Sequence, residues 1–229
     1  MEKKTKKEIK KIKSLPILAL SANAHNGLDW FHSLLDGHNQ IIILPAFSFF
    51  RFLVREKISN DSLLNKQTLC NYVTNCLYHK KGYQVPRRKF FNSLSEKKKF
   101  NKNLFIFFLH EEISIKNLFY GIHYAFLKMK KENILSKKII VSHEHMCWNH
   151  KKYYIFKNVK FAFIIRDPRA AFAGSILQMK KVNQNMFLES HQMNKILLNF
   201  IEGWNFMLQQ EKKSSNRIYF LINERLNKK

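Results

Sequence analysis

The chain has 229 residues, 45% of them hydrophobic, which is enough for one domain with a sizeable core and too short for two comfortable ones. No apolar run approaches the roughly 18 residues of a membrane helix, so we expect no transmembrane segment. The formal net charge of +25 at pH 7 favours an anionic partner, such as nucleotide phosphates, an acidic glycan, nucleic acid or a membrane surface. An AT-rich coding bias would produce the same excess of lysine, so the charge alone selects none of these partners.

The first segment expected to enter the core begins at Leu15. Residues 1–14 are rich in lysine and are expected to form a solvated basic arm, followed by one domain over residues 15–229. The apolar run 17–22 is expected to be a buried strand. A signal peptide ending at "ANA" is the alternative, but its apolar stretch "LPILAL" is shorter than the roughly 7–15 apolar residues of such a peptide and carries Pro16 near its start.

A tight loop and a helix are expected after this strand. The helix is predicted over residues 28–36 from apolar residues that share one helical face, namely Leu28, Phe31, Leu34 and Leu35. Gly37 is expected to end it, because glycine tolerates the left-handed conformation of a helix C-terminus.

The rest of the chain alternates apolar strands with amphipathic helices. We expect strands over residues 40–44, 138–141, 160–165 and 216–223, and helices over residues 46–57, 114–133 and 194–213 and from Pro168 onward. The Lys-rich residues 59–102 are expected to form helices and loops along one wall of a cleft. This alternation predicts an α/β fold with a mostly parallel central sheet flanked by helices.

The cysteines bear on the cellular compartment. Cys70, Cys76 and Cys147 have no recognisable disulfide or metal spacing, which favours a reducing compartment and a cytoplasmic protein. Small buried apolar residues are the simplest role for all three.

Two strand ends carry groups that suit an anion. Ligands of an open parallel sheet bind beyond the carboxyl ends of its strands. After the first strand, "HNGLD" opens a helix whose N–H groups and dipole would cradle a negative charge. After the strand over 160–165, Arg166 offers a bidentate fork for a phosphate, and Ser175 could add a hydroxyl. Two such sites suggest a doubly phosphorylated ligand, unless Arg166 pairs with Asp167 or caps the sheet.

The usual phosphate-loop motif of nucleoside triphosphatases is absent. No G-x-x-x-x-G-K-[ST] pattern occurs in the chain, so the lysine and the hydroxyl that serve a triphosphate and its magnesium are missing. An ordinary ATPase or GTPase is therefore disfavoured.

Three segments together resemble a known family. "GLDWFHSLLDGHNQI" after a strand, "VKFAFIIRDPRAAFAGS" and "NRIYFLINERL" occur in the order found in the sulfotransferases that use 3′-phosphoadenosine 5′-phosphosulfate (PAPS). With the strand before the first of them, these elements cover most of the chain from Leu15 to Leu226. The resemblance implies a nucleotide-binding fold related to the phosphate-loop proteins, with no metal. It also implies a further segment that closes over the nucleotide. The chain stops at Lys229, so we expect either that this lid is dispensable or that the chain is short or degenerate.

The resemblance implies roles for individual residues. The family's first loop reads like R-S-G-T-T and binds the 5′-phosphosulfate, and these positions fall in order on His25, Asn26, Gly27, Leu28 and Asp29. Asp29 would repel a phosphosulfate unless it is turned away or paired. Arg166 matches the arginine that binds the 3′-phosphate. The family's serine lies eight positions after that arginine, whereas Ser175 lies nine positions after it.

The segment "VSHEHMCWNH" carries the candidate catalytic base. In the sulfotransferases a histidine, or in some branches a glutamate, deprotonates the acceptor from a strand end near the cofactor. His143 and His145 share one face of an extended segment and Glu144 points to the other, so the histidines are the first candidates. Purely structural histidines are one alternative. The other is a zinc site from His143, His145, Cys147 and His150.

The sequence therefore predicts a sulfotransferase that moves a sulfuryl group from PAPS to a hydroxyl or amine acceptor. "LLDGH" resembles the glycan-modifying branches, so a glycan or a related metabolite is the expected acceptor. The alternative is a non-catalytic anion-binding protein, either a degenerate sulfotransferase domain or a basic module for nucleic acid or an acidic glycan. The missing cation and hydroxyls of the first loop favour this alternative.

Overall fold

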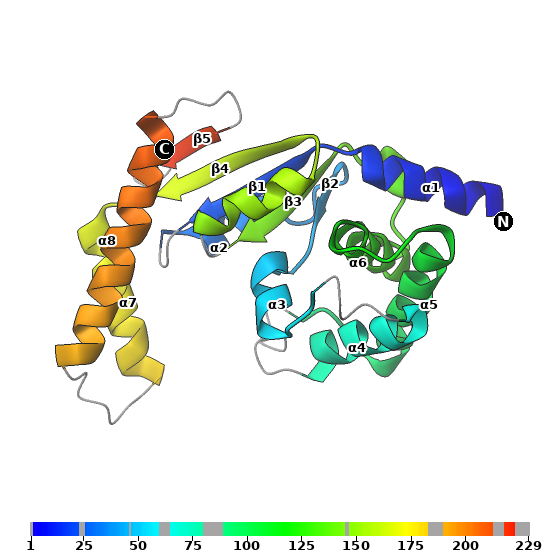
Figure 1. Cartoon of the computed structure of the whole chain (residues 1–229), viewed down its shortest axis with the longest axis horizontal. Coiled ribbons are helices and arrows are strands. Elements are labelled where there is room, and N and C mark those ends of the chain that lie inside the picture. Colours follow the sequence, from blue (N-terminus) through cyan, green and yellow to red (C-terminus); the bar gives the residue numbers. More distant parts are fainter. Residues whose placement is uncertain are drawn as a thin grey trace.

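The structure is a computed structural model that describes residues 2–22, 26–45, 47–59, 65–79, 89–144, 147–182, 190–212 and 218–222 (Figure 1). The strands of these residues form one all-parallel sheet of five, in the order β2-β3-β1-β4-β5. They are β1 (Ile17–Ala22), β2 (Ile41–Ile43), β3 (Ile139–Glu144), β4 (Val159–Ile165) and β5 (Ile218–Ile222). The predicted α/β fold with a parallel sheet and flanking helices is confirmed.

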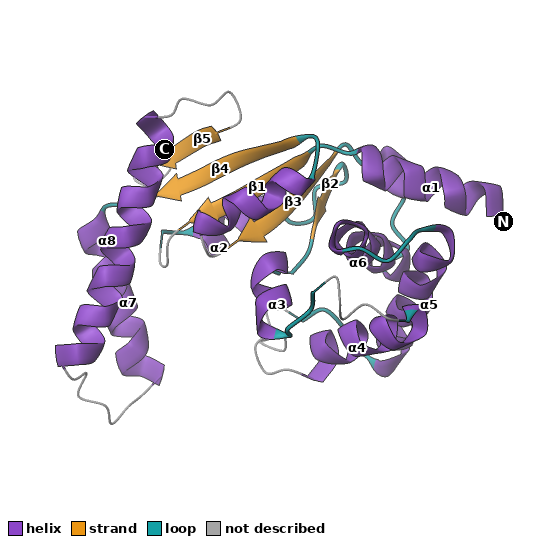
Figure 2. Cartoon of the chain, viewed as in Figure 1, coloured by secondary structure: helices purple, strands orange, loops and turns teal. Residues whose placement is uncertain are grey.

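The helices connect these strands and cover both sides of the sheet (Figure 2). They are α1 (Glu2–Ser14), α2 (Leu28–Leu35), α3 (Phe49–Arg55), α4 (Lys66–His79), α5 (Leu94–His110), α6 (Ile115–Met129), α7 (Pro168–Val182) and α8 (Ser190–Lys212). Two 3₁₀ helices, η4 (Ile134–Ser136) and η5 (Cys147–Ile155), flank β3. None of the described helices is long and apolar enough to cross a membrane.

Strand β1 lies at the centre of the sheet, with β3 on one side and β4 on the other. Its side chains alternate between two apolar clusters, because successive residues of a strand point to opposite faces. Ile17 and Ala19 belong to the large cluster, and Leu20 and Ala22 belong to the small cluster under α2. Burial on both faces is typical of a parallel sheet and explains the continuous apolar run.

Strand β3 is longer than the sequence predicts. The predicted strand ends at Val141, where the apolar run ends, but β3 continues through Ser142, His143 and Glu144, and all three are buried. Buried polar groups need hydrogen-bond partners, and these are supplied by segments distant in sequence. The carboxyl end of β3 is therefore polar inside the protein.

The N-terminal segment differs from the solvated arm expected over residues 1–14. Residues 2–14 form α1, whose Ile9 and Ile12 are buried in the large apolar cluster. Glu8 is also buried and binds the Lys128 ammonium of α6 at 3.1 Å. Lysine dominates the composition of this segment, but one apolar stripe suffices to dock an amphipathic helix.

A helical unit is inserted between β2 and β3. It comprises α3 to α6, and its core is an aromatic cluster of edge-to-face rings that includes Phe47, Phe90, Phe100 and Phe119. Helices α5 and α6 are preceded by the N-cap residues Ser93 and Ser114, and each serine hydroxyl accepts a hydrogen bond from the backbone N–H of the residue three positions later. The Lys-rich region 59–102 thus contributes α4 and part of α5; residues 60–64 and 80–88 lie outside the described residues.

Candidate functional site

The carboxyl ends of β1, β3 and β4 lie side by side at one edge of the sheet. From β1 the chain leads through α2 to β2 at one edge strand, whereas from β4 it leads through α7 and α8 to β5 at the other. Neighbouring strands whose connections diverge leave a crevice at their carboxyl ends, which is where ligands of open α/β sheets bind. The candidate site is built from the side chains around this crevice.

The turn after β1 brings residues 26–29 to this edge. Gly27 has a left-handed φ of 89°, and its carbonyl accepts the first helical hydrogen bond of α2, from the N–H of Phe31 at 3.0 Å. Asn26 and Leu28 are buried, and Leu28 packs in the small cluster under α2. His25 lies outside the described residues. The first N–H groups of α2 therefore lie at the carboxyl edge, where helix N-termini favour anions.

Asp29 is paired with a histidine of β3. Its Oδ1 lies 3.3 Å from Nε2 of His143, and half of the Asp29 side chain is exposed while His143 is buried. Asp29 would repel an anion at this loop unless its carboxylate is turned away or paired. In the structure it is paired with His143. This contact joins the end of β3 to the first turn of α2.

His143 has a second imidazole as neighbour. Its Nδ1 lies 3.1 Å from Nδ1 of His32, and the two rings meet edge to face with their centroids 4.9 Å apart. His32 is on the buried face of α2, below Asp29 by one turn. A carboxylate and two imidazoles thus form a continuous chain, which is an arrangement that can hold and pass a proton.

The buried face of α2 differs from the predicted one, because it includes His32. Four apolar residues were expected on it, but the fully buried positions of α2 are Leu28 and His32, Phe31 and Leu35 are half-buried, and Leu34 is exposed. The apolar pattern predicts no buried position for His32, because it rests on the hydrophobic residues of α2 alone. A histidine four positions after a buried leucine is the signal that could have identified it.

The other face of β3 carries a second polar group. Glu144 is buried, and its Oε1 accepts a hydrogen bond of 2.5 Å from the Ser48 hydroxyl. Ser142, on the same face, is bonded to the Tyr153 hydroxyl at 2.6 Å. Burial, and next the charge of Glu144, raise the pKa of Tyr153 well above its usual value. His143 and Glu144 thus point to opposite faces of the sheet, as the strand period predicts.

The zinc alternative rests on residues that the structure describes only in part. His145 lies outside the described residues, and the side chains of Cys147 and His150 do too. Within the described part of the chain, no group of three or more His, Cys, Asp or Glu side chains could hold a metal ion.

The end of β4 carries Arg166, Asp167 and Arg169. Arg166 is half-buried directly after the strand. The Asp167 carboxylate caps α7 by accepting the backbone N–H of Arg169 at 2.8 Å, and it binds the Arg169 guanidinium at 2.6 and 3.1 Å. These hydrogen bonds lower the pKa of Asp167 to about 2. Asp167 therefore caps α7 and binds Arg169.

Ser175 faces its own helix. Its buried hydroxyl donates to the Ala171 carbonyl at 3.2 Å, one turn back along α7. A phosphate at the end of β4 could receive this hydroxyl only after a change of the Ser175 side-chain rotamer. By contrast, the Ser21 hydroxyl at the end of β1 is buried without a hydrogen-bond partner among the described residues.

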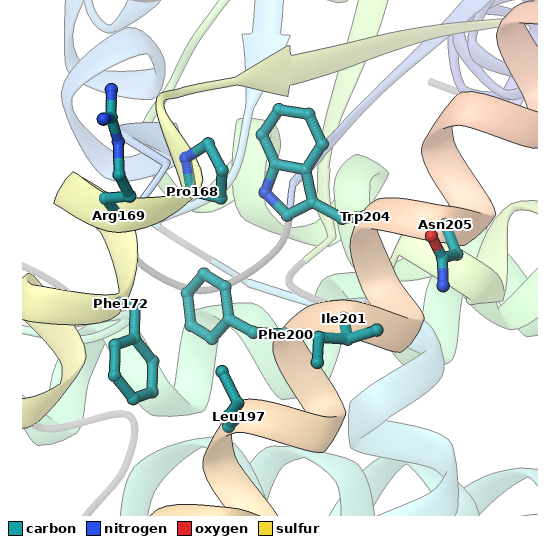
Figure 3. A pocket seen from close by; sticks show the side chains of 8 residues that line it. All are labelled: Pro168, Arg169, Phe172, Leu197, Phe200, Ile201, Trp204 and Asn205. Carbon is teal, nitrogen blue, oxygen red and sulfur yellow. The ribbon is translucent and has the colours of Figure 1, made fainter.

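An apolar cavity of about 340 Å³ opens next to the end of β4, between α7 and α8 (Figure 3). Pro168, Phe172, Phe200 and Trp204 line it, and Arg169 lies at its rim. The walls of this cavity are mainly apolar side chains, so it could hold an apolar group but few polar groups of a ligand. It is therefore a neighbour of the polar edge rather than part of it.

No family model, no curated protein and no solved structure matches this chain.

Proposed function

We propose that this protein is a sulfotransferase that moves a sulfuryl group from PAPS to a hydroxyl or amine acceptor, with a glycan or a related metabolite as the acceptor. The contact between Asp29 and His143, at 3.3 Å, carries the proposal. Asp29 stands in the segment that resembles the phosphosulfate loop, and His143 stands on the strand end that resembles the catalytic one. The fold brings these two motifs, more than 100 residues apart in sequence, into one site.

The residues at this edge fit a phosphosulfate donor. The left-handed Gly27 lets the chain turn sharply after β1, so that the first N–H groups of α2 and its dipole face the anion. The carboxylate that would repel the anion is engaged by His143. Arg166, at the neighbouring strand end, would hold the 3′-phosphate by a bidentate contact.

The proposed reaction is an in-line transfer. The acceptor oxygen or nitrogen attacks sulfur while the bond from sulfur to the nucleotide oxygen breaks. A base at the end of β3 takes the acceptor proton, and His143 and His145 are the first candidates, followed by Glu144. Positioning and charge neutralisation would supply most of the rate, as in phosphoryl transfer, and the step needs no metal.

A non-catalytic anion-binding protein is the second candidate. The loop after β1 offers neither a strong cation nor a hydroxyl between Asn26 and Asp29, and the Ser175 hydroxyl is directed at its own helix. An unspecialised basic surface with a net charge of +25 would bind RNA, DNA or an acidic glycan instead.

Replacing Arg166 tests the proposal. If its guanidinium grips the 3′-phosphate, Arg166→Ala should weaken binding of adenosine 3′,5′-bisphosphate by roughly 2–4 kcal/mol and binding of adenosine 5′-monophosphate far less. Arg51→Ala removes the same charge from the exposed side of α3 and should change neither affinity. Equal losses for both nucleotides in Arg166→Ala would make the arginine structural and would count against the proposed donor.

A further inference from the structure

We propose that a groove between α3, the start of α6 and η5 binds a small amphiphilic anion, in which a carboxylate, sulfate or phosphate is joined to an apolar chain. The groove has a volume of about 610 Å³, which lies within the range of roughly 300–1,000 Å³ that small-molecule sites occupy. None of the described residues that we place at the carboxyl edge lines it. The inference is therefore independent of the proposed sulfuryl transfer.

The wall of this groove is mainly apolar. Phe50, Leu53 and Ile58 line it, and they are buried members of the large apolar cluster. Val54 and Ile155 also line it, although their side chains are 66% and 45% exposed. An alkyl chain in the groove would remove this exposed apolar surface from water, which favours binding.

Three lysines from three elements line the same groove. Lys57 follows α3, Lys116 is in the first turn of α6, and Lys152 is in η5. None of the three ammonium groups has an ion-pair partner in the described ranges, and no described Asp or Glu lines the groove. By contrast, Lys128 is paired with Glu8 where α1 packs on α6. An apolar groove bordered by unpaired positive charges is complementary to a ligand that is both apolar and anionic.

Helix α6 adds to the positive potential of the groove. Ser114, Ile115 and Lys116 line it at the start of this 15-residue helix, whose first turn contains no acidic residue. The Ser114 hydroxyl accepts the N–H of Asn117 at 3.1 Å, and the helix dipole favours an anion at this end. The dipole acts on the same groove as the three lysines and reinforces their preference for an anion.

Lys57 has a backbone conformation that favours glycine. Its φ is 53°, in the left-handed region, and the N–H of Ile58 donates to the Leu53 carbonyl at 2.9 Å. Glycine is the usual residue at this position after a helix. Lys131, with a φ of 59°, follows α6 with the same hydrogen-bond pattern, but it does not line the groove. These two lysines therefore form a matched pair that differs in contact with the groove.

Methyl NMR of the full chain tests the groove with four probes: decanoate, decanol, decyltrimethylammonium and acetate. At about pH 7.5 the carboxylates are ionised and the lysines are protonated. We expect decanoate to shift the methyl signals of Ile58, Ile115 and Ile155 with saturation, decanol to bind more weakly, and the cation and acetate to give no saturable shift. The signals are assigned from single Ile→Val variants. Equal affinity for decanol and decanoate would overturn the proposal.

Ile201 controls for general binding to apolar surface, because it lines the other apolar cavity, between α7 and α8. We expect its methyl signal to respond less to decanoate than the three isoleucines of the groove. An equal response at every decanoate concentration would mean that the anion binds exposed apolar surface without selecting the groove, and the proposal would be wrong.

Replacing the three groove lysines by glutamine tests their role. Loss of each partly exposed contact should weaken decanoate about two- to fivefold, so the triple variant should lose roughly tenfold or more, with decanol unchanged. The control variant removes the same charge from the exposed side of α1, at Lys3, Lys4 and Lys7. An unchanged affinity in the groove variant, or equal losses in the two variants, would overturn the proposal.

Lys57→Gly separates binding from folding. Glycine adopts the left-handed conformation without strain, so Lys57→Gly and Lys131→Gly should both melt no lower than the wild-type chain. Only Lys57→Gly should weaken decanoate, about two- to fivefold. A loss of affinity in a variant of undiminished stability cannot come from misfolding. If both variants bind decanoate equally well, Lys57 does not contact the anion and the lysine-bordered site is wrong.

Sedimentation with phosphatidylcholine vesicles that contain phosphatidylserine distinguishes a monomeric ligand from a membrane surface. We expect decanoate to bind the groove without vesicles present, and the triple groove variant to sediment with them as the wild-type chain does. Binding to vesicles that is lost in the triple variant, together with no saturable response to decanoate, would assign the groove to a membrane surface and overturn the proposed small-molecule site.

Discussion

The aromatic core of the inserted helical unit and the polar carboxyl end of β3 are both buried, but they are held in place by different interactions. Phe119 and His143 are both almost completely inaccessible. Phe119 packs against five other rings, from Phe49, Tyr120, His123, Tyr153 and Phe156. His143 is held by two specific polar contacts, to Asp29 and His32. Burial of an apolar ring lowers the free energy of the folded state whatever the orientation of its neighbours. Burial of a polar group does so only when a hydrogen-bond partner is correctly placed.

The two regions therefore have different roles: the aromatic core chiefly stabilises the fold, whereas the polar end of β3 is the candidate for chemistry. An apolar core tolerates substitutions that keep its volume and apolarity at a modest cost in stability. Three polar residues at the end of a buried strand need hydrogen bonds from α2, α3 and η5, so they constrain several elements at once. Buried titratable groups with specific partners cluster at functional sites, which is why the polar end of β3 is the functional candidate.

The largest effect is expected in the aromatic core. Phe119→Ala removes a fully buried ring and should lower the free energy of unfolding by about 3–5 kcal/mol, because the surrounding rings can only partly fill the cavity. Leu109→Ala, at a side chain that is 57% exposed, should change it by less than about 0.5 kcal/mol. Urea denaturation measures both. A small loss in Phe119→Ala would mean that the aromatic cluster is loosely packed.

His123 is the titratable group inside this aromatic core. Its Nδ1 lies 2.7 Å from the Phe119 carbonyl, and burial lowers its pKa to about 4 from its ordinary value of 6.5. A histidine whose pKa is lower in the folded state favours folding above pH 6.5, and this contribution is lost as the pH falls toward 4. The difference of 2.5 units corresponds to about 3 kcal/mol, since one unit is worth about 1.4 kcal/mol.

The pH dependence can be isolated by comparing the protein with His123→Leu. The free energy of unfolding is measured for both between pH 7 and pH 4, where other groups titrate equally in the two chains. We expect the wild-type chain to lose about 3 kcal/mol more than the variant over this range. Parallel curves would show that His123 is not held neutral by the core.

A smaller effect is expected at the polar edge. Ser48→Ala removes the hydroxyl that donates to buried Glu144 at 2.5 Å and should lower the free energy of unfolding by about 1–3 kcal/mol. Ser33→Ala is the matched control, because the exposed Ser33 hydroxyl bonds only the Trp30 carbonyl of its own helix. If both variants are equally stable, Glu144 does not depend on Ser48, and the contrast with the aromatic core weakens.

Much of the fold follows from local patterns in the sequence. The apolar run 17–22 coincides with β1, and the predicted helix from Pro168 coincides with the start of α7. Both depend on signals within a few residues, namely an unbroken apolar strand and a proline that starts a helix well. The N-terminal segment was misjudged because its lysines outnumber the two isoleucines that dock it, and docking depends on a surface contributed by α6 and η4.

The site was predictable only in part. The strand period places His143 and Glu144 on opposite faces, and the structure agrees. His32, Ser48 and Tyr153 were missed, because each acts through a contact with β3 across the fold, and such contacts leave no local period or motif. An anion can bind beside Asp29 only if this carboxylate is turned away or paired, and the sequence does not show which. Its partner in the structure is His143, which lies 114 positions further along the chain.

Titration calorimetry with adenosine 3′,5′-bisphosphate tests the central claim, that the carboxyl edge binds the nucleotide of a sulfuryl donor. We expect binding with a dissociation constant of roughly micromolar order and a matching rise in the melting temperature, because a ligand that binds only the folded chain stabilises it. The same preparation is titrated with RNA and DNA over a range of salt concentrations. The absence of heat with the bisphosphate, together with tight and salt-sensitive binding of nucleic acid, would contradict the claim and identify the protein as a basic nucleic-acid-binding module.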